Sequence, residues 1–228
     1  KMLARAQKQL ELETGKKDVE VKLVNSAIVS IHIDTYKVSN PVGFQGKEIT
    51  MQLYTAFAPM VHIGALERIA TQLDLDLIAV AAEPFAVSRS VIGADASSSF
   101  TAILVDVGGG TTDIAVINDG GVQGTKMFGI GGRAYTRAVE RAMDISFEDA
   151  EELKLQLSTN VVRKDERVKV ESALMKTART WSSGVELALD EFKQLDNLPN
   201  KIYLCGGGSS LDILFDELNK SNWYTDLP

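Results

Sequence analysis

The sequence predicts an α/β fold, because segments with strand-like alternation of apolar residues are interleaved with segments whose apolar residues recur at helical spacing. The 228 residues favour one large unit or two small lobes. A content of 45% hydrophobic and 24% charged residues is typical of a folded globular protein and excludes a fibrous or disordered chain.

Charge and cysteine content narrow the function classes. The 24 Lys and Arg residues against 31 Asp and Glu residues give a net charge of −7, which argues against a nucleic-acid scaffold. Cys205 is the single cysteine, so no internal disulfide is possible and a reducing compartment is expected. The isolated His32 and His62 argue against a zinc site, and no apolar run reaches the roughly 18 residues of a membrane span.

The first 78 residues are expected to form a small α/β unit. A helix near the start precedes strands over Val19–Asp34, which a turn near Asn25 and Ser26 is predicted to interrupt. A loop over Asn40–Glu48 leads into a strand over residues 49–57. The following helix is expected to turn one apolar stripe toward this sheet: Val61, Ala65, Leu66, Ile69 and Leu73.

The next elements connect this unit to the second half. A short apolar strand is predicted from residue 75 up to Glu83, and Pro84 is expected to be the first helical residue after it. The polar segment Ala94–Ser99 marks an expected lobe boundary.

The second half begins with strands around a glycine triplet. Apolar strands over residues 101–107 and 112–119 flank the triplet, and Asp119-Gly120-Gly121 predicts a hairpin into a third strand. Helices are expected at about Gly132–Met143 and Ser146–Ser158, the second capped by Ser146.

A long amphipathic helix and a second glycine triplet complete the chain. The helix is predicted over Val170–Leu195, with a core-facing stripe of Val170, Leu174, Ala178, Trp181, Val185, Ala188 and Phe192. A strand over residues 201–205 then runs into Gly206–Gly208 and a helix that Ser209 or Ser210 could cap.

The segment LVDVGGGTTDIAVI carries the clearest chemistry. Gly108, Gly109 and Gly110 lie between two strands, where backbone N–H groups can converge on an anion such as phosphate. Asp106 ends the first strand and would face the phosphate through Mg²⁺, while Thr111 and Thr112 add hydroxyl donors. The spacing excludes a P-loop and a dinucleotide fingerprint. The alternative is a glycine-rich hairpin with a surface aspartate.

Two further segments could complete a nucleotide site. Gly206–Gly208 would let backbone lie against a planar ring, or would simply make a tight turn. Glu151, Lys154 and Ser158 share one helical face, where a carboxylate and an ammonium could hold vicinal hydroxyls such as those of ribose. The alternative is a routine exposed ion pair.

The order of these motifs resembles the actin-like ATPase superfamily of actin, sugar kinases and heat-shock chaperones. DVGGGTTDIAV is similar to its second phosphate loop, GIGG to the following turn, AEELK to its ribose-contacting helix and LCGGGSSL to its adenosine motif. EPFAVSRSVIG resembles its connecting segment, in which the acid matching Glu83 helps to orient the attacking water. The resemblance implies an actin-like (ribonuclease H-like) ATPase core that binds ATP and Mg²⁺.

Within the superfamily, SNPVGFQGKEITMQLYTAF resembles the small inserted subdomain of the FtsA family of bacterial cell-division proteins. EPFAV and the helix after GIGG also resemble the pilus-assembly protein PilM. The resemblance to FtsA implies a nucleotide-switched, polymerising scaffold that links the division ring, a tubulin-like partner, to the inner face of the cell membrane. At most weak Mg-dependent hydrolysis is implied.

The resemblance also implies boundaries and site residues. The inserted subdomain would be residues 1–78, a remnant of the first lobe residues 79–98, and the second lobe residues 99–228 with a reduced helical part at 147–195. Catalytic roles fall on Glu83 and Asp106, with Asp106 also the metal residue and Asp113 a weaker phosphate-loop candidate. The implied cofactor-binding residues are Gly108, Gly109, Gly110, Thr111, Thr112, Gly131, Gly132, Glu151, Lys154, Gly206, Gly207, Gly208 and Ser209.

The chain departs from the family pattern at both ends. No first phosphate loop precedes Lys1, and no C-terminal membrane helix follows Pro228, so a fragment or a reduced relative is expected. Two other functions stay open: a sugar kinase, and an interaction module that keeps the glycine loops but binds no nucleotide.

Overall fold

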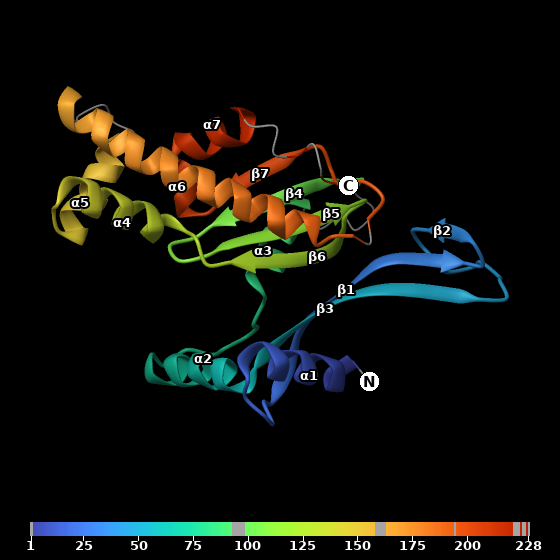
Figure 1. The fold of residues 1–228 in the computed structure, drawn as a ribbon. Helices are drawn as coiled ribbons and strands as arrows, with labels where there is room; N and C mark the ends of the chain where they lie inside the picture. The colour runs from blue at the N-terminus through green and yellow to red at the C-terminus, as the bar shows by residue number, and fades with distance from the viewer. Residues whose placement is uncertain are drawn as a thin grey trace. The chain divides into compact units, whose positions relative to one another are not determined.

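The computed structural model describes residues 2–92, 99–157, 163–193, 195–220, 224 and 227. The chain divides into two compact units (Figure 1), here called unit 1 (Lys1–Ser99 and Asp119–Gln123) and unit 2 (Phe100–Asn118 and Gly124–Pro228). The boundary expected at Ala94–Ser99 lies mostly outside the described residues.

Unit 1 is a three-stranded antiparallel sheet with helices. The strand order is β2-β1-β3, so β1 is central. The elements are α1 (Met2–Thr14), β1 (Val21–Ile33), β2 (Tyr36–Val38), β3 (Ile49–Pro59), α2 (Met60–Gln72) and α3 (Glu83–Ile92).

The turn predicted near Asn25 and Ser26 is wrong. One strand, β1, pairs with β3 along its whole length, and a register shift between Leu23 and Asn25 marks a bulge. A bulge absorbs an extra residue while the strand continues. Because β3 supplies hydrogen-bond partners on both sides of the bulge, these polar residues do not end the strand.

The predicted strand from residue 75 and the predicted packing of α2 are also wrong. Residues 75–82 form no strand, and α3 begins at Glu83, with Pro84 in its first turn. No described strand pairs with this segment, so its apolar residues do not form part of a β-sheet. On α2 the buried residue is Ile63, whereas Val61 and Ile69 of the expected stripe are 68% and 53% exposed.

Unit 2 is built on a mixed four-stranded sheet. The strands are β4 (Ala102–Val107), β5 (Thr112–Asn118), β6 (Gly121–Phe128) and β7 (Ile202–Cys205), in the order β6-β5-β4-β7. The strand β4 pairs antiparallel with β5 and parallel with β7. The predicted hairpin between β5 and β6 is confirmed, with Asp119 and Gly120 both at positive φ.

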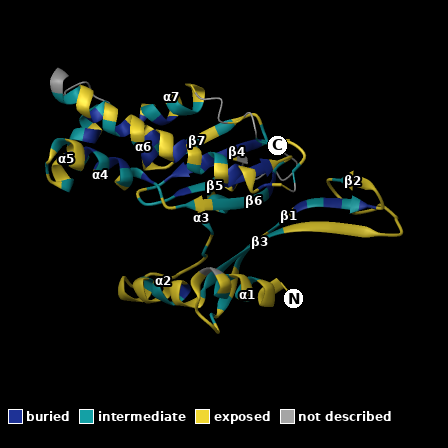
Figure 2. Cartoon of the chain, in the orientation of Figure 1, coloured by how far each residue is buried: buried dark blue, intermediate teal, exposed yellow. Residues whose placement is uncertain are grey.

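Helices pack against this sheet and carry the core of unit 2. They are α4 (Gly132–Met143), α5 (Phe147–Gln156), α6 (Lys164–Asp190), the 3-10 helix η2 (Gly207–Ser210) and α7 (Asp212–Lys220). Figure 2 shows buried residues concentrated in the strands and along α6. The predicted cap of α5 is confirmed, because Ser146 Oγ accepts the Asp149 N–H at 3.1 Å.

The stripe predicted for the long helix is confirmed. All seven of its residues are buried, although α6 ends at Asp190 and Phe192 lies just beyond it. Trp181 is the largest fully buried side chain of the described residues. No described helix has both the length and the apolar character of a membrane span.

Candidate functional site

The β4–β5 hairpin of unit 2 positions the first glycine triplet. Within the connecting loop, the Gly108 N–H donates to Thr111 O at 2.9 Å. The start of α4 holds the loop from the other side, since the Gly132 N–H donates to Gly108 O and the Arg133 N–H to Gly109 O, each at 2.8 Å. The carbonyl groups of Gly108, Gly109 and Thr111 are thereby occupied.

The N–H groups of Gly109 and Gly110 make no hydrogen bond within the described part of the chain. Backbone N–H groups that are free can donate hydrogen bonds to an anion. The loop therefore has the donors that a phosphate group requires.

Gly131 fits against this loop in a way that no larger residue can. A Cβ atom on Gly131 would lie 2.5 Å from Gly108 O and 2.8 Å from the Thr111 N atom. A Cβ atom on neighbouring Gly132 would instead make ordinary contacts, the nearest 3.6 Å from Gly108 O. The predicted turn GIGG thus braces the glycine loop through one glycine, Gly131.

Two carboxylates flank the loop at the ends of its strands. Asp106 on β4, only 8% exposed, is the cross-strand partner of Asp113 on β5. Burial raises the pKa of Asp113, a hydrogen bond from Thr111 Oγ1 at 3.2 Å opposes the rise, and the charge of Asp106 adds to it.

This pair of carboxylates fits a hard cation. Mg²⁺ is typically held by one or two carboxylates, with water and substrate phosphate completing its ligands. Within the described residues no cluster of three or more His, Cys, Asp or Glu side chains could hold a metal ion by itself. The two carboxylates therefore suit a cation whose other ligands are water and a phosphate.

The raised pKa of Asp113 gives a pH-dependent prediction. Folding raises the pKa of Asp113, so the ionised carboxylate destabilises the folded protein once the pH rises above that pKa. Asp113→Asn removes this charge and is therefore expected to be more stable than the unmodified protein at pH 7. Below the ordinary value of 3.8 the difference should disappear. Thermal melts from pH 3 to 8 measure it, and Asp216→Asn, at an exposed residue of α7, is the matched control.

Adding Mg²⁺ extends this measurement. We expect Mg²⁺ to stabilise the unmodified protein more than Asp113→Asn, because the variant lacks one of the two charges. Equal melting temperatures for both proteins at pH 7 would contradict the assigned origin of the pKa shift.

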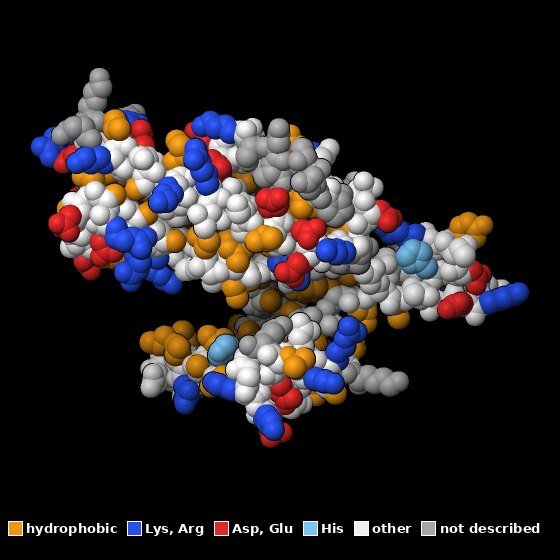
Figure 3. Space-filling model, in the orientation of Figure 1, with side chains coloured by type: hydrophobic (Ala, Val, Ile, Leu, Met, Phe, Trp, Pro, Cys, Tyr) orange, Lys and Arg blue, Asp and Glu red, His pale blue; other side chains and the backbone are white. Residues whose placement is uncertain are grey.

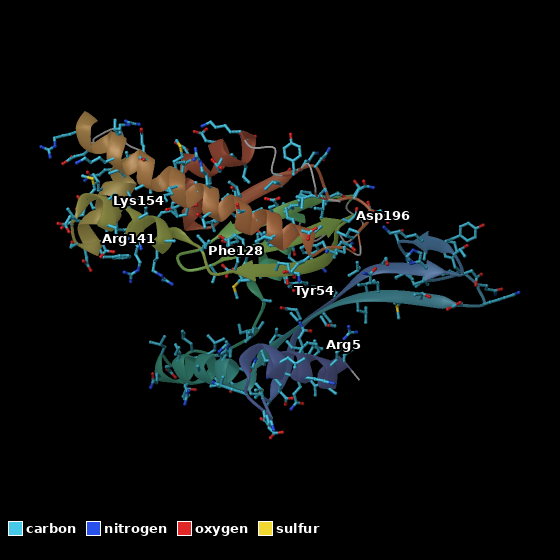
Figure 4. All side chains as sticks on the ribbon, in the orientation of Figure 1. Arg5, Tyr54, Phe128, Arg141, Lys154 and Asp196 are labelled. Atoms are coloured by element: carbon cyan, nitrogen blue, oxygen red, sulfur yellow. The ribbon has the colours of Figure 1, made fainter. Side chains whose placement is uncertain are left out.

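Glu151 and Lys154 of α5 form a partly buried pair, not the routine exposed pair that was the alternative. The Lys154 side chain is 6% exposed and that of Glu151 is 39% exposed. Lys154 Nζ donates to Glu151 Oε2 at 2.7 Å, to Thr136 Oγ1 at 2.9 Å and to Gly132 O at 3.3 Å. The ammonium group thus connects α5 to the start of α4 (Figure 4).

The electrostatics of this pair keep Glu151 ionised. Burial alone would raise the pKa of Glu151, but hydrogen bonds from Lys154 and Thr136, with the Lys154 charge, lower it below its ordinary value. A partly exposed carboxylate that stays ionised can accept hydrogen bonds from hydroxyl groups.

The second glycine triplet lies against β4 beside the first. A Cβ atom on Gly206, whose φ is +79°, would lie 2.2 Å from Asp106 Oδ1 and 2.6 Å from Val107 O, and one on Gly208 would lie 2.8 Å from Val107 O. Gly207 has open space around it. Two of the three glycines are thus required by packing, and the motif is fixed next to Asp106.

The prediction that Ser209 or Ser210 caps α7 is wrong. Ser209 Oγ donates to Gly206 O at 2.7 Å and Ser210 Oγ donates to Gly207 O at 2.9 Å. Both hydroxyls close the 3-10 turn η2, and α7 begins only at Asp212.

A groove of about 580 Å³ adjoins the Lys154 side of this site. Its walls come from α5, α6, η2 and α7, and they include Lys154, Met175, Arg179, Ser210 and Leu211. A mixed wall of apolar stems and polar groups suits a planar heterocycle.

The structure places some predicted residues elsewhere. The Thr112 hydroxyl is fully buried, donates to Ile130 O at 2.6 Å and accepts from Trp181 Nε1 at 2.9 Å, so it supports the loop from the core and is not available to a phosphate. Glu83 is the first residue of α3 in unit 1. Ser158 lies outside the described residues.

Three residues of unit 2 were not predicted. Thr136 contacts both members of the Glu151–Lys154 pair, and Arg133 lies over the glycine loop. Arg133 comes directly after GIGG and Thr136 one helical turn after Gly132, and this nearness to the motif was the available signal. Tyr135 is fully buried, and its hydroxyl is the one buried side-chain polar atom in the described structure with no hydrogen-bond partner.

Comparisons with known proteins find related sequences. The family model described as cell division protein FtsA matches residues 103–215. FtsA of Enterococcus hirae is 24% identical over 78% of this chain and 44% of its own length, and FtsA of Escherichia coli K12 is 30% identical over 72% and 40%. The chain therefore spans less than half the length of these relatives.

Solved structures share the fold at low sequence identity. The PilM-PilN type IV pilus biogenesis complex matches with a TM-score of 0.65 and 18% identity over 97% of this chain and 63% of the other. MreB5 of Spiroplasma citri bound to AMPPNP matches with a TM-score of 0.51 and 16% identity over 71% and 64%. These likenesses confirm the expected actin-like α/β fold.

Proposed function

Because this chain belongs to the actin-like ATPases and is homologous to the FtsA cell-division proteins, we propose that it binds ATP with Mg²⁺ in unit 2 and acts as a nucleotide-dependent scaffold in cell division. The observation that carries this proposal is the loop of Gly108–Gly110. Its two free N–H groups lie in the same unit as two flanking carboxylates, the Glu151–Lys154 pair and the second glycine triplet. The related fold of MreB5, solved with AMPPNP, supports the same ligand class.

In this proposal the phosphate end lies at the first triplet. The N–H groups of Gly109 and Gly110 would donate to phosphate oxygens, and Thr111 Oγ1 could turn from Asp113 to do the same. Asp106 and Asp113 would hold Mg²⁺ through water. When bound, the ion would neutralise part of the phosphate charge.

The nucleoside end would lie along α5 and η2. The partly exposed Glu151 would accept hydrogen bonds from the ribose hydroxyls, and Lys154 would keep this carboxylate in place. The backbone of Gly206–Ser209 and the adjoining groove would hold the adenine ring. We expect hydrolysis to be weak at most.

The wider role rests on homology. We propose that the whole protein self-associates into filaments, binds the tubulin-like protein of the division ring and works at the inner face of the cell membrane. The FtsA relatives are named as cell-division proteins, and this chain covers less than half of their length.

Calorimetry with Mg-ATP tests the nucleotide site. We expect Gly109→Asp to abolish the binding seen for the unmodified protein, because a carboxylate at the loop would repel phosphate. Gly64→Asp is the matched control: it adds the same charge in unit 1, where a Cβ atom meets nothing within 4 Å. The absence of binding by the unmodified protein would contradict the proposal and favour a nucleotide-free interaction module.

A second function, a scaffold in pilus assembly, is favoured by one observation. The fold of the PilM-PilN complex covers 97% of this chain, more than the FtsA alignments cover. A fluorescent fusion of the full-length protein distinguishes the two: recruitment to the division site supports the first proposal, and recruitment to pilus machinery without it supports the second.

A further inference from the structure

Arg133 occupies the space that the glycine loop leaves open. It is the second residue of α4, and its N–H donates to Gly109 O at 2.8 Å. A Cβ atom on Gly110 would lie 2.3 Å from Arg133 Nη2, and one on Gly109 would lie 3.5 Å from Nη1. The guanidinium group therefore lies directly over the two glycines whose N–H groups are free.

The charge of Arg133 is not neutralised by the part of the chain that the structure describes. No described acidic side chain forms an ion pair with it, and the side chain is exposed. By contrast Arg137, one turn later, pairs with Glu140 at 3.6 Å and lies over the Phe147 ring. Arg133 thus carries a cation at the loop without a protein partner.

A phosphate group would supply that partner. A guanidinium group matches a phosphate in a fork of two parallel hydrogen bonds, and the free N–H groups of Gly109 and Gly110 lie on the same loop. The positive end of the α4 dipole adds to this attraction at Arg133, which lies in its first turn. The guanidinium group and the free glycine N–H groups therefore belong to the same loop region, next to the positive end of the α4 dipole.

We propose that Arg133 is a phosphate-binding residue of this site, one that strengthens the binding of ADP and ATP and not that of adenosine. The inference rests on the proposed function, because it names a further residue of the same nucleotide site. Figure 3 shows lysines and arginines gathered near α4, and of the described basic residues Arg133 is the one that lies over the glycine loop.

Calorimetry with Mg-ATP, Mg-ADP and adenosine tests the inference. We expect Arg133→Ala to weaken ATP binding by about tenfold or more, in line with the loss of charge-assisted hydrogen bonds, and to leave adenosine binding unchanged. Arg133→Lys should restore part of the affinity, because lysine keeps the charge but not the fork. Arg141→Ala, at an exposed arginine of the same helix (Figure 4), should change nothing.

The outcomes separate the two proposals. Equal ATP affinities for Arg133→Ala and Arg141→Ala would overturn the role of Arg133 and leave the nucleotide site intact. An equal loss of adenosine binding would also overturn it, because the residue would then act on the fold. No ATP binding by the unmodified protein would overturn both proposals. Binding of inorganic tripolyphosphate, lost in Arg133→Ala alone, supports the inference without a nucleoside.

Discussion

Replacing Gly131 with alanine is expected to abolish Mg-ATP binding, a loss of about 100-fold or more. The new Cβ atom would lie within 3 Å of Gly108 O and the Thr111 N atom, both of them backbone atoms of the glycine loop. Backbone cannot rotate away as a flexible side chain can, so the loop must move. The N–H groups of Gly109 and Gly110, which we propose to bind phosphate, would then be displaced.

Gly132→Ala is the matched control for this variant. The two glycines are adjacent, but a Cβ atom on Gly132 has no contact nearer than 3.6 Å. We expect Gly132→Ala to bind Mg-ATP with near-normal affinity. Calorimetry measures both affinities, and thermal melts show how much stability Gly131→Ala loses, about 1–3 kcal/mol for an overpacked site. Equal binding by both variants would contradict the bracing role of Gly131.

Trp181→Ala is expected to lower the free energy of unfolding of unit 2 by about 4 kcal/mol. Trp181 is fully buried on α6, so alanine leaves a large cavity in the core. The variant also removes the Nε1–H donor of Thr112 Oγ1, which is itself buried at the start of β5. Urea denaturation followed by circular dichroism measures the change.

Two further variants separate the sources of that loss. Trp181→Phe keeps most of the volume and removes only the hydrogen bond, so a smaller loss of about 1–2 kcal/mol is expected. Leu187→Ala, at a 69% exposed residue of the same helix, should change stability by less than about 0.5 kcal/mol. Similar losses for Trp181→Ala and Leu187→Ala would contradict the core position of the tryptophan.

Local sequence patterns were sufficient to predict the features that depend on residues close together in the chain. The strands around Gly108–Gly110, the cap at Ser146 and the buried stripe of α6 all follow from spacing within a few residues. Such features depend on chain periodicity and on capping groups close by. The motif order then led to the expected fold, which the structural comparisons confirm.

Features that depend on distant partners could not be predicted in this way. The segment of residues 75–82 is as apolar as a strand, but forms none because no described strand pairs with it. Asn25 looks like a turn residue, but β3 keeps it in a bulged strand. Strand pairing depends on two segments of the chain, so the sequence pattern of one segment alone does not predict it.

The spacing of residues within the predicted strands and helices singled out the glycines and carboxylates of the candidate nucleotide site, because such spacing reflects local backbone geometry. The tertiary structure sets the surroundings of each side chain there. It turned Thr112 into the core toward Trp181, 69 residues away, and placed Arg133 over the loop. It also buried Lys154 against α4. Burial and hydrogen bonding depend on what surrounds a residue, and these neighbours meet only when the chain has folded.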